Sequence, residues 1–231
     1  MSHRRLTVPL LNALLLAAAL LLAGCDDKPS FHNTDVTGLE YARDFKLTDH
    51  TGKPRTLADF RGKVVSIFFG YTQCPDVCPT TMAEMKEVLR KLGPADAAKV
   101  QVLFVTIDPE RDTQALLAQY VPAFDPSFIG LRGDLEATAK TAKDFKVFYQ
   151  KVPGKTPGSY TMDHTAGSYV YDPQGCLRLF VRHAPPDTDA SQSTDWLVSD
   201  IRILLNTTKP DPSSSVCKTK QEAAAAPSKG S

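Results

Sequence analysis

The feature that most constrains the fold of this chain is an apolar run that leads directly into a helix-forming segment, with two cysteines between them. Residues 63–69 are predicted to form a buried strand, and the apolar residues of 80–92 recur at helical spacing. The connection reads Gly-Tyr-Thr-Gln-Cys-Pro-Asp-Val-Cys-Pro and contains Cys74 and Cys78. Folds built from alternating strands and helices place their sites at the carboxyl ends of buried strands. The two cysteines therefore stand where a functional site is expected.

The rest of the chain continues this alternation. Further strands are predicted at 100–107 and 128–131, and further helices at 112–120, 134–145 and 195–205, the first of them capped by Asp112. Turn residues predict one hairpin near the start, at 45–57, and another near the end, at 168–181. The sequence thus predicts an α/β sandwich. Residues 147–163 show little periodicity and are predicted to be a long loop before the last hairpin, of a length that is usually functional or disordered.

The first residues have the pattern of a secretory signal. Two arginines precede an apolar stretch at 13–23, which is shorter than the roughly 20 residues of a comfortable membrane span. The stretch ends in Leu-Ala-Gly-Cys, which resembles the lipobox of bacterial lipoproteins. This resemblance implies that residues 1–24 are a signal peptide and that Cys25 is lipidated, while an uncleaved anchor helix is the alternative. Asp26 resembles the signal for staying on the inner membrane, so the protein is expected to be lipid-anchored on the periplasmic face of that membrane.

Composition and patterning divide the remaining chain. Residues 25–40 are polar and unpatterned and are predicted to be a tether, 41–208 to be the folded domain, and 209–231, rich in Pro, Ser, Lys and Ala, to be a disordered tail. The hydrophobic content of 42% fits a globular domain. With a formal net charge of +1 and no basic block, nothing in the sequence indicates a nucleic acid partner.

Export changes how the five cysteines are interpreted. In an oxidising compartment, thiols become disulfides, metal ligands or redox centres. If Cys25 carries lipid, four cysteines remain, and parity alone suggests that Cys176 and Cys217 form a disulfide. Cys74 and Cys78 then form the second pair, whose chemistry the residues leave open among a structural bridge, a redox disulfide and a metal site.

The surroundings of Cys74 and Cys78 favour reactive or metal-binding sulfurs. Pro79 suits the first turn of a helix, so Cys78 is expected near the positive helix end, which favours its thiolate. Two thiolates select Cu(I) or serve Zn(II). A third ligand would be a histidine, and His164 directly after the long loop is the candidate, although a lone histidine there is more often structural. The other four are less suited, because they lie in the leader, the tether, a turn and an expected surface position: His3, His32, His50 and His183.

Three ordered motifs resemble the Sco/SenC family over residues 41–205. They are Phe-Gly-Tyr-Thr-Gln-Cys-Pro-Asp-Val-Cys-Pro at 69–79, Asp-Pro-Glu-Arg-Asp-Thr at 108–113, and Asp-His at 163–164. The resemblance implies a thioredoxin-like fold outside the membrane that binds one copper ion through Cys74, Cys78 and His164. Asp108 is a candidate for tuning the metal or handing it over, although a turn residue before a proline explains it equally. Cys176 departs from the family, whose members more often have another residue there.

The resemblance also implies a function. The protein is expected to be a copper metallochaperone, not an enzyme, that assists assembly of the CuA centre of cytochrome c oxidase. Its expected partners are the CuA-bearing oxidase subunit or another copper chaperone, and the membrane through its lipid. One alternative is a periplasmic thiol-disulfide oxidoreductase that uses Cys74 and Cys78 as a redox disulfide, and another is a peroxidase-like enzyme. His164 discriminates between copper binding and thiol exchange, because dithiol exchange does not need it.

The lipid anchor gives the first testable expectation. Mass spectrometry of the mature protein should find residues 1–24 removed and a lipid on Cys25, and Cys25→Ser should release the protein from the membrane or block its maturation. An unmodified Cys25 in the mature protein would contradict the lipoprotein interpretation.

Overall fold

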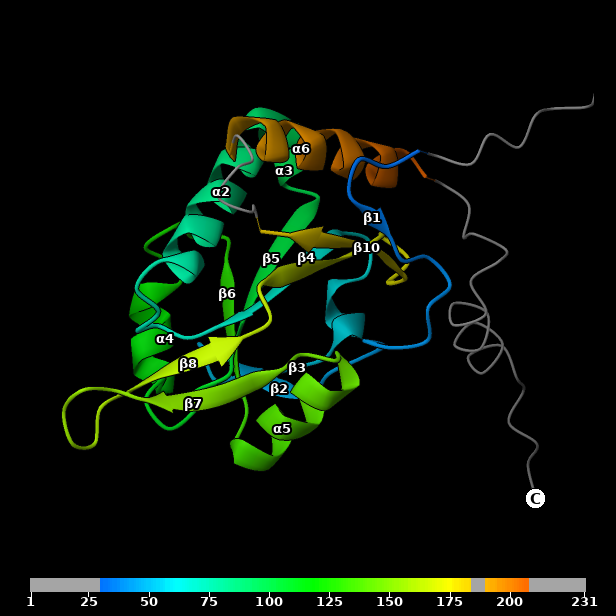
Figure 1. The fold of residues 1–231 in the computed structure, drawn as a ribbon. Coiled ribbons are helices and arrows are strands. Elements are labelled where there is room, and N and C mark those ends of the chain that lie inside the picture. Colours follow the sequence, from blue (N-terminus) through cyan, green and yellow to red (C-terminus); the bar gives the residue numbers. More distant parts are fainter. Residues whose placement is uncertain (1–29, 184–189, 208–231) are drawn as a thin grey trace, which may run out of the picture. The chain divides into compact units, whose positions relative to one another are not determined.

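The computed structural model describes residues 30–183 and 190–207, within which eight strands form one sheet (Figure 1). The order across this sheet is β1-β10-β9-β4-β5-β6-β2-β3. β4, β5 and β6 are parallel neighbours, whereas β9 pairs with β4 in the antiparallel sense. The strands are β1 (Thr34–Asp35), β2 (Leu47–Asp49), β3 (Pro54–Arg55), β4 (Val64–Gly70), β5 (Val100–Thr106), β6 (Ile129–Arg132), β9 (Gly167–Tyr171) and β10 (Leu177–Arg182).

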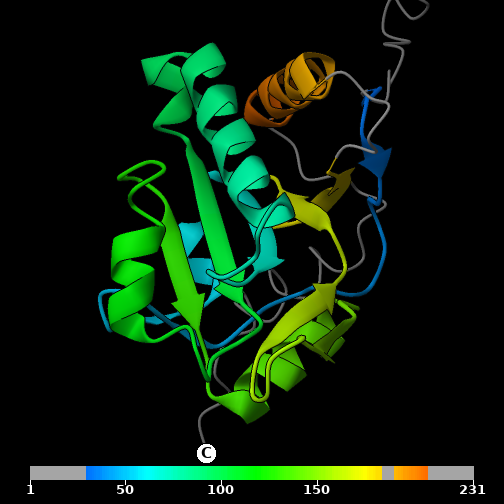
Figure 2. The same cartoon turned by 60° about the vertical axis from the view of Figure 1, so that its left-hand side comes forward.

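Helices cover both faces of the sheet. α2 and α6 lie side by side against one face, and α5 lies on the other (Figure 1, Figure 2). A short 3-10 helix, η1, follows β3. The helical elements are η1 (Leu57–Phe60), α2 (Val77–Leu92), α3 (Pro94–Ala97), α4 (Gln114–Tyr120), α5 (Leu135–Asp144) and α6 (Ala190–Asn206).

β4 is the centre of the core. All of its residues and all of those of β5 are buried. Because successive side chains of a strand point to opposite faces, Phe68 packs against Phe104 at 6.0 Å between ring centroids, while Phe69 packs against Phe145 beyond the end of α5 at 5.1 Å. Burial on both faces explains why the sequence of β4 is a continuous apolar run rather than an alternating one.

Most predicted elements are confirmed. The two predicted hairpins are β2–β3 and β9–β10, and the strands and helices between them occur in the predicted order. α2 begins at Val77 rather than Thr80, so Cys78 lies in its first turn. α4 is capped by Thr113, whose hydroxyl accepts the backbone N–H of Leu116 at 3.2 Å, and not by Asp112 as expected.

The predicted long loop at 147–163 is wrong. This segment contains β7 (Tyr149–Pro153) and β8 (Tyr160–His164), which pair as a separate antiparallel hairpin with Tyr149 opposite His164. Most of its side chains are exposed. β7 is exposed along most of its length and lacks the alternation of apolar and polar residues that predicts a strand. β8 does alternate, with Met162 buried between two exposed residues, but over only five residues.

The predicted tether also needs correction at its C-terminal end. Thr34 and Asp35 form β1 and pair with Phe180 and Leu179 of β10. The buried carboxylate of Asp200 on α6 accepts hydrogen bonds from the backbone and side chains of the two residues His32 and Asn33. Because these partners are polar and far apart in the sequence, no local sequence pattern predicts their contact.

Other expectations fall outside the described residues. These are the signal peptide, Cys25, the first part of the tether and the tail with Cys217. In the part of the chain that the structure describes, no helix is long and apolar enough to cross a membrane.

The contact between Asp200 and the N-terminal segment should contribute strongly to stability. Asp200→Ala is expected to lower the free energy of unfolding by about 3 kcal/mol, because it removes the charged acceptor shared by several donors. Asp195→Ala on the same helix is the matched control, since its exposed carboxylate pairs only with Lys91 and should matter little. Urea unfolding of both variants checks this, and equal losses would contradict it.

Candidate metal centre

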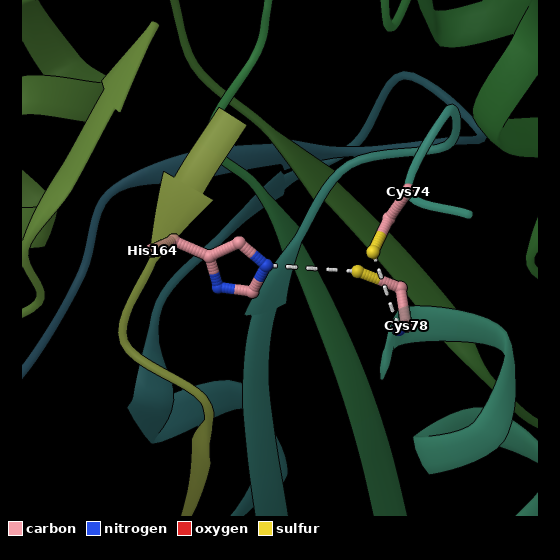
Figure 3. Close-up of side chains that lie close together, drawn as sticks. All are labelled: Cys74, Cys78 and His164. Atoms are coloured by element: carbon pink, nitrogen blue, oxygen red, sulfur yellow. Dashed lines mark hydrogen bonds between the residues drawn. The ribbon is translucent and has the colours of Figure 1, made fainter. Parts of the chain in front are cut away.

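Three segments bring Cys74, Cys78 and His164 together (Figure 3). Cys74 lies in the loop after β4, Cys78 is the second residue of α2, and His164 is the last residue of β8. The Sγ and imidazole nitrogen atoms of the three lie within 4.8 Å of one another. His164 Nε2 is 3.8 Å from Cys78 Sγ, and the backbone N–H of Cys78 donates to Cys74 Sγ at 3.4 Å. The three residues implied by the family resemblance are therefore neighbours in space.

The position of Cys78 depends on a glycine at the end of β4. A Cβ atom at Gly70 would lie 2.8 Å from Cys78 Sγ and 2.9 Å from the Phe68 ring. Such distances are too short for non-bonded atoms, so any larger residue at Gly70 would displace the sulfur. Cys78 is fully buried in this gap, whereas Cys74 is only partly buried.

The loop that carries Cys74 is held by a buried carboxylate that sequence reasoning treated only as a helix cap. Asp112 accepts the hydroxyl and backbone N–H of Thr72, at 2.6 and 3.1 Å, and the hydroxyl of Thr106 at 2.6 Å. Burial raises the pKa of Asp112, and these hydrogen bonds oppose the rise. The only signal in the sequence was that Asp112 lies in the second of the three motifs.

The orientation of His164 leaves Nε2 available. Its Nδ1 lies 3.0 Å from the carbonyl oxygen of Thr165. A carbonyl oxygen only accepts, so Nδ1 is the nitrogen that donates to Thr165, and Nε2 is the nitrogen that faces the sulfurs. The imidazole is also enclosed at its edges by the rings of Phe68 and Tyr71, whose centroids are 6.3 and 6.1 Å away.

The two sulfurs share one proton. A hydrogen bond from the Cys78 thiol is the main reason that the pKa of Cys74 falls to about 3. The His164 side chain and the backbone N–H groups of Asp76 and Cys78 act in the same direction, and burial opposes them. The same hydrogen bond, together with burial, raises the pKa of Cys78 far above its ordinary value. Cys74 is thus the thiolate of the metal-free pair and Cys78 the thiol.

This assignment reverses an expectation. From the sequence, the favoured thiolate is expected on Cys78, because this residue lies near the start of a helix. In the structure the free N–H groups at the start of α2 point to Cys74 Sγ, which lies outside the helix and in front of its first turn. The positive end of α2 therefore stabilises the thiolate of Cys74, which faces the helix end, rather than that of Cys78, which is part of the helix.

A groove of about 330 Å³ opens over the partly buried side of the site. Cys74 and His164 both line it, while Cys78 lies behind them in the core. An incoming ion or a donor atom of another molecule therefore has access to two of the three candidate ligands. The groove is completed by residues of the cysteine loop and of β8 and its end: Tyr71, Pro75, Asp76, Val77, Thr161, Met162, Asp163 and Ala166.

Two other candidates are placed differently from the three ligands. Asp108 is buried, and its carboxylate accepts from Arg111 and, at 3.0 Å, from the hydroxyl of Tyr160, so it contacts β8 rather than the sulfurs. His183 was expected at the surface, but its side chain is only 9% exposed. Its Nε2 lies 2.9 Å from Ser168 Oγ and its ring packs edge-on against Phe68, because β10 pairs with β9 up to Arg182, the residue directly before His183.

Cys176 does not belong to the cluster formed by Cys74, Cys78 and His164. Cys176 is buried and disulfide-bonded, whereas Cys74 and Cys78 are free thiols. Its predicted partner Cys217 lies outside the described residues, so that pairing stays a prediction. The free pair is not used to cross-link the fold.

Comparison with known proteins assigns the chain to a family. A family model described as SCO1/SenC matches residues 34–199. The mouse mitochondrial protein SCO2 homolog is 39% identical over 160 residues, which cover 69% of this chain and 60% of that protein. The chain thus matches less than two thirds of the length of this relative.

Solved structures extend the likeness to the fold. The copper-bound ScoI of Bradyrhizobium japonicum is 42% identical with a TM-score of 0.61, and the match covers 70% of this chain and 98% of that one. Apo Sco1 from Thermus thermophilus is 40% identical with a TM-score of 0.64, covering 78% and 99%. The predicted thioredoxin-like α/β fold is confirmed. The chain belongs to the SCO1/SenC family.

Proposed function

We propose that this protein is a copper metallochaperone that carries one ion on Cys74, Cys78 and His164. The observation that carries the proposal is the convergence of two sulfurs and one imidazole nitrogen within 4.8 Å at the base of an open groove. Two soft thiolates and an imidazole suit copper, Cu(I) above all. The copper-bound relative from Bradyrhizobium japonicum supports the choice of metal.

The chemistry of the donors suits a carrier. Cys74 is already a thiolate, and the Cys78 proton must leave before both sulfurs bind the ion, so loading releases a proton. Three candidate ligands converge within the described part of the chain, and the groove would leave one side of the ion open to a donor from an acceptor protein. Metal can then pass by ligand exchange without the domain unfolding.

We propose the CuA-bearing subunit of cytochrome c oxidase, or another copper chaperone, as the partner in this transfer. Family membership supports this assignment. The N-terminal pattern supports a lipid on Cys25 that keeps the domain on the periplasmic face of the inner membrane, beside a membrane-bound oxidase. In this role the protein assists assembly and is not an enzyme.

One observation favours thiol-disulfide exchange as a second candidate function. The exposed member of the pair is a thiolate, and the buried member is a thiol beside it. This is the arrangement of an attacking sulfur and a resolving sulfur. Oxidation of the pair to a disulfide would also remove both sulfur ligands, so the two candidate functions exclude one another at any moment.

Copper binding by variants tests the ligand assignment. Reduced wild-type protein isolated from the periplasm should hold one copper ion per chain, Cys74→Ala and Cys78→Ala should lose it, and His164→Ala should bind at least about tenfold more weakly. His32→Ala is the matched control, because this imidazole lies against Asp200 and Trp196 and should leave binding unchanged. Metal analysis and competition with a Cu(I) chelator measure these affinities.

The outcomes separate the two functions. Full copper binding by His164→Ala would remove His164 from the ligand set. If cells that contain only this variant also assemble CuA normally, thiol reduction would replace copper transfer as the proposed function.

The proton shared by the sulfurs gives a pH prediction. Only a thiolate is alkylated rapidly, so the iodoacetamide reaction of Cys74 in reduced, metal-free protein should be nearly constant from about pH 5 to about pH 8. An ordinary thiol would instead react about tenfold faster for each pH unit over this range. Cys78→Ala removes the main donor to Cys74, which raises its pKa and should bring back the pH dependence. A steep wild-type profile would contradict the assigned thiolate.

A further inference from the structure

The guanidinium group of Arg111 lies where three segments of the site meet. Its Nε donates to the buried carboxylate of Asp108, and its Nη1 donates to Gln73 Oε1 at 3.0 Å and to the carbonyl oxygen of Tyr160 at 2.8 Å. Gln73 directly precedes Cys74, and Tyr160 begins the strand that ends in His164. One side chain therefore joins the loop of the first sulfur ligand to the strand of the histidine.

Arg111 contacts the Tyr160 ring as well as the Tyr160 carbonyl oxygen. The Arg111 guanidinium stacks on the Tyr160 ring at 3.6 Å from its centroid, and the Tyr160 hydroxyl donates to Asp108 Oδ1 at 3.0 Å. Arg111, Asp108 and Tyr160 thus form a closed set of three contacts. The Arg111 side chain is 20% exposed and that of Asp108 only 1%, so water competes weakly for the bond between them.

These contacts matter because the β7–β8 hairpin is attached to the rest of the domain at few points. Within the described residues its two strands pair only with each other and form no ladder with the eight-stranded sheet. Its outer contact is the ion pair of Lys151 with Glu110, which is about half exposed on both sides. Exposed pairs contribute little, so three attachments remain to hold the hairpin: the Met162 side chain in the core, a hydrogen bond from the backbone of Met162 to Tyr71, and the contacts of Arg111.

We propose that Arg111 is the positioning residue that holds the hairpin against the cysteine loop and so sets the gap between His164 and the two sulfurs. The inference rests on the proposed copper site, since that gap is where the ion would bind. A lysine could not replace this arginine, because an ammonium group cannot stack on Tyr160 and reach Asp108, Gln73 and the Tyr160 carbonyl from one rigid plane. Under this proposal Asp108 orients Arg111 and Tyr160 and does not bind the metal.

Hydrogen exchange in the metal-free, reduced protein tests the hairpin directly. Arg111→Lys should speed exchange in peptides covering residues 149–164 at least about tenfold, while exchange in β4 and β5 stays unchanged. Tyr160→Phe keeps the stacked ring and loses only the hydroxyl contact, so its increase should be smaller. Arg132→Lys is the matched control, since Arg132 donates to the backbone of the same loop, at Asp112 and Pro109, but has no hydrogen bond to the hairpin.

Two results of this measurement would overturn the proposal. One is an Arg111→Lys hairpin that exchanges at the wild-type rate. The other is an equal increase in Arg132→Lys, because the effect would then come from a loosened loop and not from the contact with the hairpin.

Copper binding then tests the consequence for the ligands. Cu(II)-loaded wild type should show the nitrogen hyperfine splitting of a bound imidazole in its paramagnetic resonance spectrum. Arg111→Lys should show a weaker nitrogen signal and bind Cu(I) about tenfold more weakly, with both sulfurs still titratable. An unchanged signal and affinity in Arg111→Lys would overturn the positioning role. Wild-type protein that takes up no copper would instead overturn the proposed function, while hydrogen exchange still decides whether Arg111 holds the hairpin.

Discussion

The burial of β4 on both faces is the constraint on which the other elements depend. Every residue of this strand is buried, so it must have neighbours on both edges and helices over both faces. β5 and β9 supply the edges, and α2 with α6 covers one face while α5 lies over the other. The same strand delivers the cysteine loop at its carboxyl end, where Gly70 leaves just enough room for the sulfur of Cys78.

The site joins one rigid part to one that is held more lightly. Cys78 lies in the core, and the loop of Cys74 is fixed by the hydrogen bonds of Thr72 to Asp112. His164 instead comes from a largely exposed hairpin outside the main sheet. This arrangement suits a protein that must both take up and release an ion. The histidine can move away with its hairpin while the core and the two sulfurs keep their positions.

Charge in the site is set mainly by the hydrogen bond between the two sulfurs, and the backbone adds to it. The Cys78 thiol donates to Cys74 and the N–H groups at the start of α2 face it, so the negative charge resides on the sulfur that the groove exposes. Cys78 stays protonated because it is buried and hydrogen-bonded to that charge. The metal-free site is therefore ready to bind a soft cation at its outer sulfur first.

Apolar periodicity is a local property, so the strand and helix that flank Cys74 and Cys78 and the α/β order of the chain can be predicted from the sequence alone. The sequence also singles out His164 among the five histidines, but only the motif resemblance links this residue to the cysteines. The hairpin at 149–164, the pairing of Thr34 with β10 and the thiolate at Cys74 emerge only from the three-dimensional structure. So does the place of Arg111 between the cysteine loop and the hairpin. These features depend on short strand pairings and polar contacts, which leave no periodic trace in the sequence.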